Sequence, residues 1–125
     1  MILDTNALSA FADADRDLLK VLPGDRPWAL PVVVIGEYRY GLRESIQRTA
    51  REQWLASLLT AVTVLPIRES TTNHYATVRH ELKVANRRIP PNDSWIAALA
   101  LEHRLPVLTR DTHFDFVSGV IRKSW

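Results

Sequence analysis

The chain has 125 residues, a formal net charge of +2 and no cysteine. This length is typical of one domain with its own core, and the lack of thiols excludes both a disulfide framework and a cysteine-based zinc site. No apolar run approaches the ~20 residues that cross a bilayer. The start, Met1-Ile2-Leu3-Asp4, lacks the basic and long apolar regions of a secretory signal. We therefore expect one soluble cytoplasmic domain spanning residues 1–125.

Short apolar runs alternate with helical patterns along the chain. Runs rich in Val, Ile and Leu predict buried strands at Met1–Leu3, Pro31–Ile35, Val62–Ile67 and Pro106–Leu108, and a weaker one at Val117–Ile121. Apolar residues at three- and four-residue spacing predict helices at Ala7–Leu22, Thr49–Leu59, Glu69–Asn86 and Asn92–His103. This alternation predicts a three-layer α/β/α sandwich with a mainly parallel sheet of four or five strands.

Two proline-containing segments mark boundaries between these elements. Pro23-Gly24-Asp25 predicts a loop. Pro90-Pro91 prevents the preceding helix from continuing, and Asn92 is then expected to cap the next helix by accepting its free backbone N–H groups.

Four carboxylates occupy equivalent positions in this predicted architecture. Asp4 follows the first apolar run, Glu37 comes two residues after the second, and Asp111 comes three residues after Leu108. Asp93 opens the helix that leads into that last strand. Because strands end and crossover helices begin at one edge of a parallel sheet, these side chains are expected to line the edge where α/β folds bind ligands.

Each acid also has an ordinary explanation. The helix dipole favours an acid in a first turn, which accounts for Glu37 and Asp93, and Asp4 and Asp111 could be turn residues. Their combination is harder to explain, since four crowded carboxylates repel one another unless a cation lies among them. Oxygen ligands without cysteine suit Mg²⁺ or Mn²⁺, and such ions activate water in phosphoryl chemistry.

The four acids lie in four short sequence motifs. These are Met-Ile-Leu-Asp4-Thr5-Asn6 at the amino terminus, Ile35-Gly36-Glu37-Tyr38, Pro91-Asn92-Asp93-Ser94-Trp95-Ile96-Ala97-Ala98, and Val107-Leu108-Thr109-Arg110-Asp111. Together they resemble the motifs of the PIN-domain nucleases, in particular the VapC-type toxins of toxin–antitoxin systems. Each motif alone is weak, but the four occur in the family's order and spacing over essentially the entire chain.

The resemblance implies a metal-dependent endoribonuclease whose catalytic and metal-binding quartet is Asp4, Glu37, Asp93 and Asp111. Asp4 and Asp93 would hold the main ion, Mg²⁺ or Mn²⁺, and either Glu37 or Asp111 would orient or deprotonate the attacking water. Thr5, Asn6 and Thr109 are candidates for hydrogen bonds that fix the acids' rotamers. The resemblance also implies a homodimer that is neutralised by a cognate antitoxin.

Other polar residues have weaker functional interpretations. Asp115 could supply a water-mediated ligand and His113 could assist proton transfer, but the sequence favours ordinary loop roles for both. Arg87, Arg88 and Arg110 are the best candidates for contacts to the RNA backbone, with solvated ion pairs as an equal alternative.

Other functional classes fit the sequence less well. A haloacid-dehalogenase-like phosphatase needs a second Asp two residues after the first, where this chain has Asn6, and its catalytic Lys has no match in Lys83. A receiver-like domain needs a Lys after a late strand, and Lys123 is too near the terminus. The intact quartet argues against a catalytically silent binding module.

Overall fold

Five short parallel strands form one sheet in the order β3-β2-β1-β4-β5. The computed structural model describes residues 1–22, 24 and 28–125. The strands span Ile2–Leu3 (β1), Ala29–Pro31 (β2), Thr63–Leu65 (β3), Val107–Leu108 (β4) and Arg122–Lys123 (β5). The predicted α/β fold with a parallel sheet is therefore confirmed. Of the loop predicted at Pro23-Gly24-Asp25, only Gly24 lies within the described residues.

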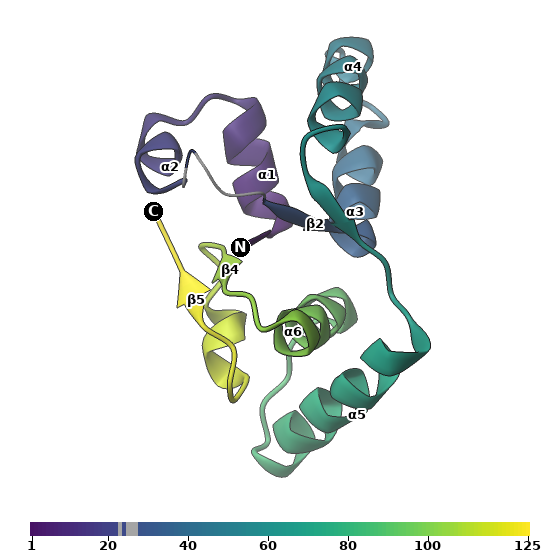
Figure 1. The fold of residues 1–125 in the computed structure, drawn as a ribbon, viewed down its shortest axis with the longest axis vertical. Coiled ribbons are helices and arrows are strands. Elements are labelled where there is room, and N and C mark those ends of the chain that lie inside the picture. Colours follow the sequence, from purple (N-terminus) through teal and green to yellow (C-terminus); the bar gives the residue numbers. More distant parts are fainter. Residues whose placement is uncertain (23, 25–27) are drawn as a thin grey trace.

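Helices lie on both sides of this sheet, with α5 and α6 on one side and α1 and α2 on the other (Figure 1). The α-helices are Thr5–Ala12 (α1), Arg16–Val21 (α2), Val32–Leu42 (α3), Arg48–Leu59 (α4), Glu69–Val84 (α5) and Pro91–His103 (α6), and Thr112–Phe116 forms a 3₁₀ helix (η1). In the described part of the chain, no helix has the length and apolar character needed to span a bilayer.

The prediction of a strand at Pro31–Ile35 is wrong. The second strand is Ala29–Pro31, and the Val-rich run that follows forms the first turns of α3. Buried side chains in α3 are Val34, Ile35, Tyr38 and Leu42, a helical spacing. Packing of this face against the core therefore overrides the strand preference of β-branched residues.

Three other boundaries differ from the prediction. The helix expected over Ala7–Leu22 is two helices, because Ala14 has a left-handed φ of 55° between them and Asp15 caps α2. The last strand is Arg122–Lys123 and not Val117–Ile121, since Gly119 turns the chain at a φ of 84°. Asn92 does not cap α6: the N-cap position is Pro90, and Pro91 is the first helical residue, where its missing N–H costs nothing.

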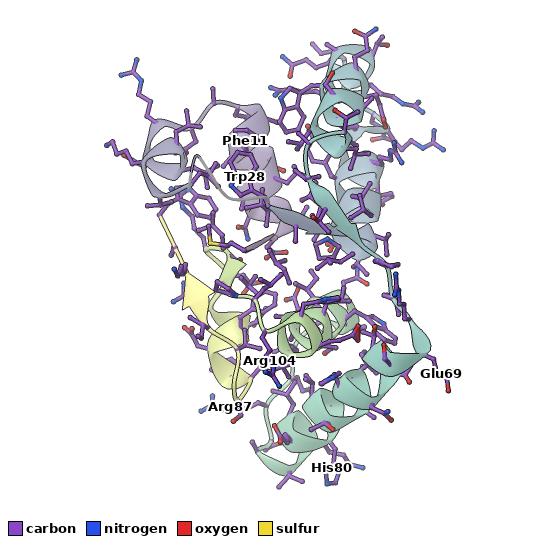
Figure 2. All side chains as sticks on the ribbon, viewed as in Figure 1. Phe11, Trp28, Glu69, His80, Arg87 and Arg104 are labelled. Carbon is purple, nitrogen blue, oxygen red and sulfur yellow. The ribbon has the colours of Figure 1, made fainter. Side chains whose placement is uncertain are left out.

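The core contains the central strands and an aromatic cluster beside them. Ile2, Leu3, Val107 and Leu108 are fully buried, as expected for strands covered on both faces. Phe11 of α1 meets Trp28 edge-to-face with ring centroids 4.9 Å apart (Figure 2), and Trp54 of α4 lies 5.6 Å from the Phe11 ring. These contacts join α1 and α4 to the segment that enters β2.

The register of the two central strands determines which residues meet at the carboxyl edge. Leu3 of β1 pairs with Leu108 of β4, so Asp4 and Thr109 are the first residues beyond the paired strands. The backbone N–H of Asp4 donates to the carbonyl of Leu108 at 3.2 Å, which continues the ladder to this point. Two segments more than one hundred positions apart are thereby fixed side by side.

Candidate functional site

Asp4 lies at the carboxyl edge of β1 and is nearly buried, with 4% of its surface exposed. Its Oδ1 accepts the backbone N–H of Thr5 at 2.7 Å. Its Oδ2 accepts the hydroxyl of Thr109 at 2.7 Å and the amide of Asn6 at 3.3 Å. The structure thus places Thr5, Asn6 and Thr109 in contact with the Asp4 carboxylate. Thr5 contributes only its backbone N–H, since its hydroxyl has no hydrogen-bond partner among the described residues.

A second group of ligand-type atoms forms where α6 and η1 begin. Asp93 in the first turn of α6, Asp111 at the N-cap of η1 and His113 each offer one such atom within 4.8 Å of the others. His113 Nδ1 lies 3.2 Å from Asp93 Oδ2 and 3.0 Å from Asp111 Oδ1. Asp111 Oδ1 also accepts the backbone N–H of His113 at 2.9 Å, which sets the position of the imidazole.

Glu37 reaches the site from the middle of α3. The sequence predicts Glu37 in the first turn of a helix, and that part of the prediction is wrong. Burial raises the pKa of its carboxyl, and the negative charge of Asp4 raises the pKa further. Its buried Oε1 has no hydrogen-bond partner within the described part of the chain. Glu37 also lines a small pocket of about 360 Å³ together with Val33, Gly36, Tyr40 and Asn92.

The electrostatics of the site show that its carboxylates repel one another. Burial and the charges of Asp4 and Asp111 raise the pKa of Asp93 to about 6. Burial, together with the charge of Asp111, also raises the pKa of Asp4. Proteins keep such groups ionised together when a cation offsets the repulsion. The donor set is oxygen-rich with one imidazole and no thiolate, and it fits a divalent metal ion.

The sequence predicts an ordinary loop role for His113, and this prediction is wrong, because the His113 ring contacts two of the four predicted acids. The spacing Asp111-Thr112-His113 carries the signal that could have identified it, because an Asp that caps a short helix brings the residue two positions later back toward its own carboxylate.

Other predicted residues lie apart from this cluster. Asp115 forms a two-bond ion pair with Arg122, at 2.7 and 3.0 Å. The guanidinium of Arg110 lies over the ring of Trp125 at 4.4 Å, while its backbone N–H donates to Asn6 Oδ1 at 3.2 Å. Arg87 lies over Phe116 at 4.7 Å, and Arg88 is exposed.

An α/β sheet with carboxylates gathered at its carboxyl edge is suited to holding a cation beside a phosphate ester. Comparison with known proteins agrees with this class. The PIN domain family matches residues 1–120 of the chain. Ribonuclease VapC5 of Mycobacterium tuberculosis is 34% identical over 120 residues, which cover 94% of this chain and 87% of the relative.

Solved structures give the same result. VapBC-5 of Mycobacterium tuberculosis, a member of the VapBC family of toxin–antitoxin systems, is 32% identical with a TM-score of 0.71, covering 98% of this chain and 94% of that one. VapBC2 of Rickettsia felis, bound to a DNA fragment from its promoter, has a TM-score of 0.88 at 22% identity over 99% and 97% of the two chains, a likeness of fold. The chain belongs to the PIN domain family, among its VapC-type ribonucleases.

Proposed function

We propose that this chain is a metal-dependent endoribonuclease and the toxin of a toxin–antitoxin pair, folded as a single nuclease domain over residues 1–125. The observation that carries the proposal is the convergence of Asp4, Asp93 and Asp111 at one edge of the sheet, in a chain of the PIN domain family. VapC5 is a ribonuclease by name, and VapBC-5 belongs to a toxin–antitoxin family. Both support the transfer of this activity to the present chain.

We assign the metal to Asp4, Asp93 and Asp111, with Glu37 completing the pocket directly or through water. Bound there, Mg²⁺ or Mn²⁺ would lower the pKa of a water molecule and stabilise charge on the phosphodiester. Asp4 is prepared for this role because Thr109 and Asn6 hold its Oδ2 in one orientation. His113 keeps Asp93 and Asp111 together through contacts at 3.2 and 3.0 Å.

Glu37 and Asp111 are the two candidates for orienting or deprotonating the attacking water, and we favour Glu37. Its Oε1 is buried and has no hydrogen-bond partner in the described part of the chain, so that oxygen is free to accept a hydrogen bond from water. A raised pKa also makes this carboxylate a stronger base. Asp111, by contrast, uses its oxygens to cap η1 and to contact His113.

Arg87, Arg88 and Arg110 remain our candidates for holding the RNA backbone. Arg88 is exposed in the connection that leads into α6, three residues before Pro91. Arg110 follows Thr109 directly, but its Nε already donates a hydrogen bond to the backbone carbonyl of Trp125 at 3.3 Å. The side chains of Arg87 and Arg88 have no counterpart to this bond in the described part of the chain. We therefore give Arg87 and Arg88 the larger share of these contacts.

The test is cleavage of RNA by the purified protein with Mg²⁺ or Mn²⁺, with and without chelator, beside the variant Asp4→Asn. We expect cleavage only with metal and only with Asp4. Cleavage that survives both changes would reject the metal site. Hydrolysis of a small phosphate ester without RNA cleavage would favour a phosphatase instead.

We further propose that the chain forms a homodimer and is neutralised by a cognate antitoxin protein. Expression of the chain alone should arrest growth, and co-expression of a small protein encoded beside it should relieve the arrest. Light scattering should give twice the chain mass of 14.2 kDa. Growth arrest by Asp4→Asn would separate toxicity from cleavage and contradict the proposal.

A further inference from the structure

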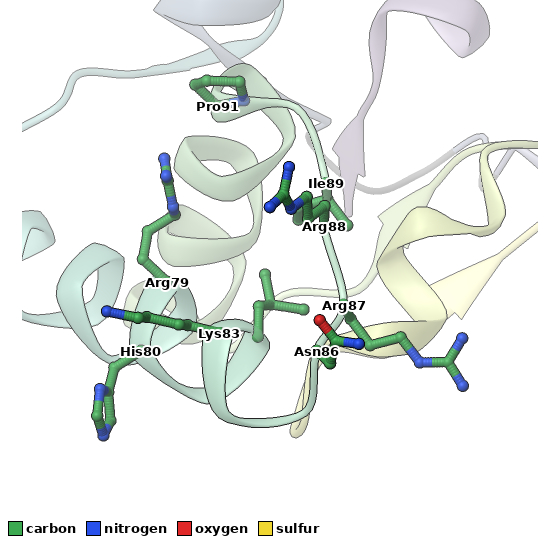
Figure 3. Close-up of a pocket in the computed structure, with 9 residues that line it drawn as sticks. Arg79, His80, Lys83, Asn86, Arg87, Arg88, Ile89 and Pro91 are labelled. Carbon is green, nitrogen blue, oxygen red and sulfur yellow. The ribbon is translucent and has the colours of Figure 1, made fainter.

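A basic pocket lies between the carboxyl-terminal half of α5 and the start of α6 (Figure 3). Its volume is about 580 Å³. Arg79, Lys83 and Arg88 are exposed around its rim, while Leu82 and Ile89 supply buried and half-buried apolar surface within it. This size falls in the range of sites for nucleotide-sized ligands, roughly 300–1,000 Å³, and is far larger than a lone phosphate needs.

The positive charge of this pocket is not neutralised within the described structure. No Asp or Glu belongs to its lining. Lys83 and Arg88 form neither an ion pair nor a hydrogen bond with any described residue. Cations that converge on a cavity without carboxylate partners create a potential that attracts polyanions.

Aromatic contacts orient two of the pocket's guanidinium groups without cancelling their charge. Arg79 donates to the hydroxyl of Tyr75 at 2.8 Å, and the Tyr75 ring is stacked on Trp95 of α6 at 3.8 Å. Arg87, at the margin of the pocket, lies over Phe116 of η1. A guanidinium held by an aromatic residue can still bind an anion, and its side chain loses less conformational entropy when the anion binds.

The pocket is connected to the acidic site through two short segments. Pro91, which lines the pocket, begins the same helical turn that carries Asp93. Phe116 belongs to η1, whose N-cap is Asp111. A polymer that reaches the acids from this side would therefore pass over the basic rim.

We propose that this pocket binds one nucleotide of the RNA strand beside the cleaved bond, an inference that rests on the proposed ribonuclease function. The rim cations contact backbone phosphates, and the base packs on Leu82 and Ile89. Phosphate contacts of this kind position the strand without reading its sequence. Arg79, Lys83 and Arg88 thus raise affinity for RNA of any sequence.

The experiment compares two double variants that remove equal charge. Lys83→Gln/Arg88→Gln neutralises the rim, and Arg16→Gln/Arg104→Gln neutralises two exposed arginines outside the pocket. Each is made in an Asp4→Asn background, and binding of a fluorescein-labelled, unstructured single-stranded RNA is measured by anisotropy without divalent metal. We expect Lys83→Gln/Arg88→Gln to bind the RNA roughly 10-fold more weakly than the Asp4→Asn chain at low salt. The slope of log Kd against log salt concentration should be smaller by about 1.4, because two phosphate contacts are lost. The Kd of the control, Arg16→Gln/Arg104→Gln, should change less than about twofold.

Equal losses in the two double variants would show a general charge effect and overturn the proposal, as would unchanged binding in both. A free mononucleotide that displaces the RNA and binds as tightly as the RNA does would assign the pocket to a small molecule, which would also overturn the proposal. A rim variant that binds RNA normally but no longer binds its antitoxin would assign the pocket to a protein. If the unmodified chain cleaves RNA while the rim variant binds normally, the proposed function stands and only this inference fails.

Discussion

A single hydroxyl, that of Thr109, connects three parts of the acidic site. It donates to Asp4 Oδ2 at 2.7 Å, and it accepts the Asn6 amide at 3.0 Å and the backbone N–H of Asp111 at 2.9 Å. Thr109 is fully buried, so water does not replace these bonds when the hydroxyl is lost. The orientation of Asp4 and the start of the loop that carries Asp111 both depend on this one atom.

We expect Thr109→Val to weaken metal binding by roughly 10- to 100-fold while the protein stays folded, because valine keeps the shape and removes the hydrogen bonds that orient the ligand. Titration of Mn²⁺ against RNA cleavage, with circular dichroism for the fold, measures this. Thr112→Val is the matched control, since Thr112 is exposed. An unchanged Mn²⁺ dependence in Thr109→Val would mean that the hydroxyl does not position Asp4.

Among the four acids of the site, Glu37 alone has a buried oxygen, Oε1, without a hydrogen-bond partner in the described part of the chain. We expect Glu37→Gln to lower kcat about 100-fold or more with a much smaller change in Mn²⁺ affinity, because an amide cannot accept the proton of the attacking water. Single-turnover cleavage at saturating Mn²⁺ measures the chemical step. Full activity of Glu37→Gln at high Mn²⁺ would show that Glu37 acts only as a metal ligand. Asp111 would then be the residue that orients or deprotonates the attacking water.

Repulsion among the acids predicts a trade between stability and function at Asp93. Burial and the charges of Asp4 and Asp111 oppose ionisation of this residue. In EDTA we expect Asp93→Asn to melt at a higher temperature than the unmodified chain, whereas Mn²⁺ should raise the Tm of the unmodified chain alone. Thermal melts with EDTA and with Mn²⁺ give both comparisons. Asp17→Asn, at an exposed acid paired with Lys20, is the control; a lower Tm for Asp93→Asn in EDTA would contradict the prediction.

The sequence was sufficient to place most of this site but not its histidine. Asp4 and Asp111 follow strands, and a parallel sheet brings strand ends together, so their proximity can be predicted from the sequence alone. His113 is harder to predict, because no hydrophobic periodicity indicates η1 and only the spacing Asp111-Thr112-His113 points to the position of its ring. Its contacts depend on the N-cap bond at Asp111, which is a local geometry and not a composition.

At the scale of helices and strands, short elements were harder to predict than long ones. The helices predicted at Thr49–Leu59 and Asn92–His103 agree with α4 and α6 to within one residue at each end. β1, β3 and β4 lie within their predicted runs, whereas the predictions for β2 and β5 are wrong because α3 begins directly after Pro31 and Gly119 turns the chain before the last strand. The run from Val32 to Ile35 had the composition of a strand, and only tertiary packing makes it a helix.

The cap of α2 gives a test at this scale. Asp15 Oδ1 accepts the backbone N–H groups of Leu18 at 3.0 Å and Asp17 at 2.9 Å, and these bonds lower the pKa of Asp15. A carboxyl with a lowered folded-state pKa adds stability above its unfolded pKa of about 3.9, and that stability is lost as the pH falls through the folded value.

We therefore expect Asp15→Ala to lower the urea midpoint at pH 7, and the difference from the unmodified chain to close as the pH falls below about 4. Asp15→Asn should keep most of the stability at pH 7, because an amide oxygen also caps a helix. Urea titrations of both variants and the unmodified chain, at pH 7 and at a pH below about 4, measure these differences in midpoint. A difference that is the same at both pH values would show that the cap does not depend on the charge.

At the scale of the whole molecule, the charge of +2 averages two different regions. Without the four acids of the site, 16 basic residues face 10 acidic ones, and 13 of the basic residues are arginine. The protein is thus a basic body around a group of four acidic side chains. A metal ion bound among these acids would offset their negative charge, which would allow a polyanion such as RNA to approach them.

This distribution predicts a salt-dependent enzyme. We expect kcat/KM for RNA cleavage to fall steeply between about 50 and 200 mM salt at constant free Mn²⁺, because each phosphate contact releases counterions from the single strand. Initial rates at subsaturating RNA give the slope, and thermal melts across the series verify that the protein stays folded. Rates that do not respond to salt would mean that the basic body takes no part in binding.

One further consequence concerns insertions and deletions. Helix α3 begins directly after Pro31 with no intervening loop, so the position of Glu37 is counted in residues from the end of β2. One residue added between them would turn the Glu37 side chain by about 100° around the helix axis, away from the other acids. The connection at residues 43–47 joins α3 and α4 outside the sheet, is mostly exposed and carries no residue of the acidic site or of the basic pocket, so its length is free to vary. Chain-length changes during divergence should therefore collect there, and the stretch from β2 to Glu37 should keep its length.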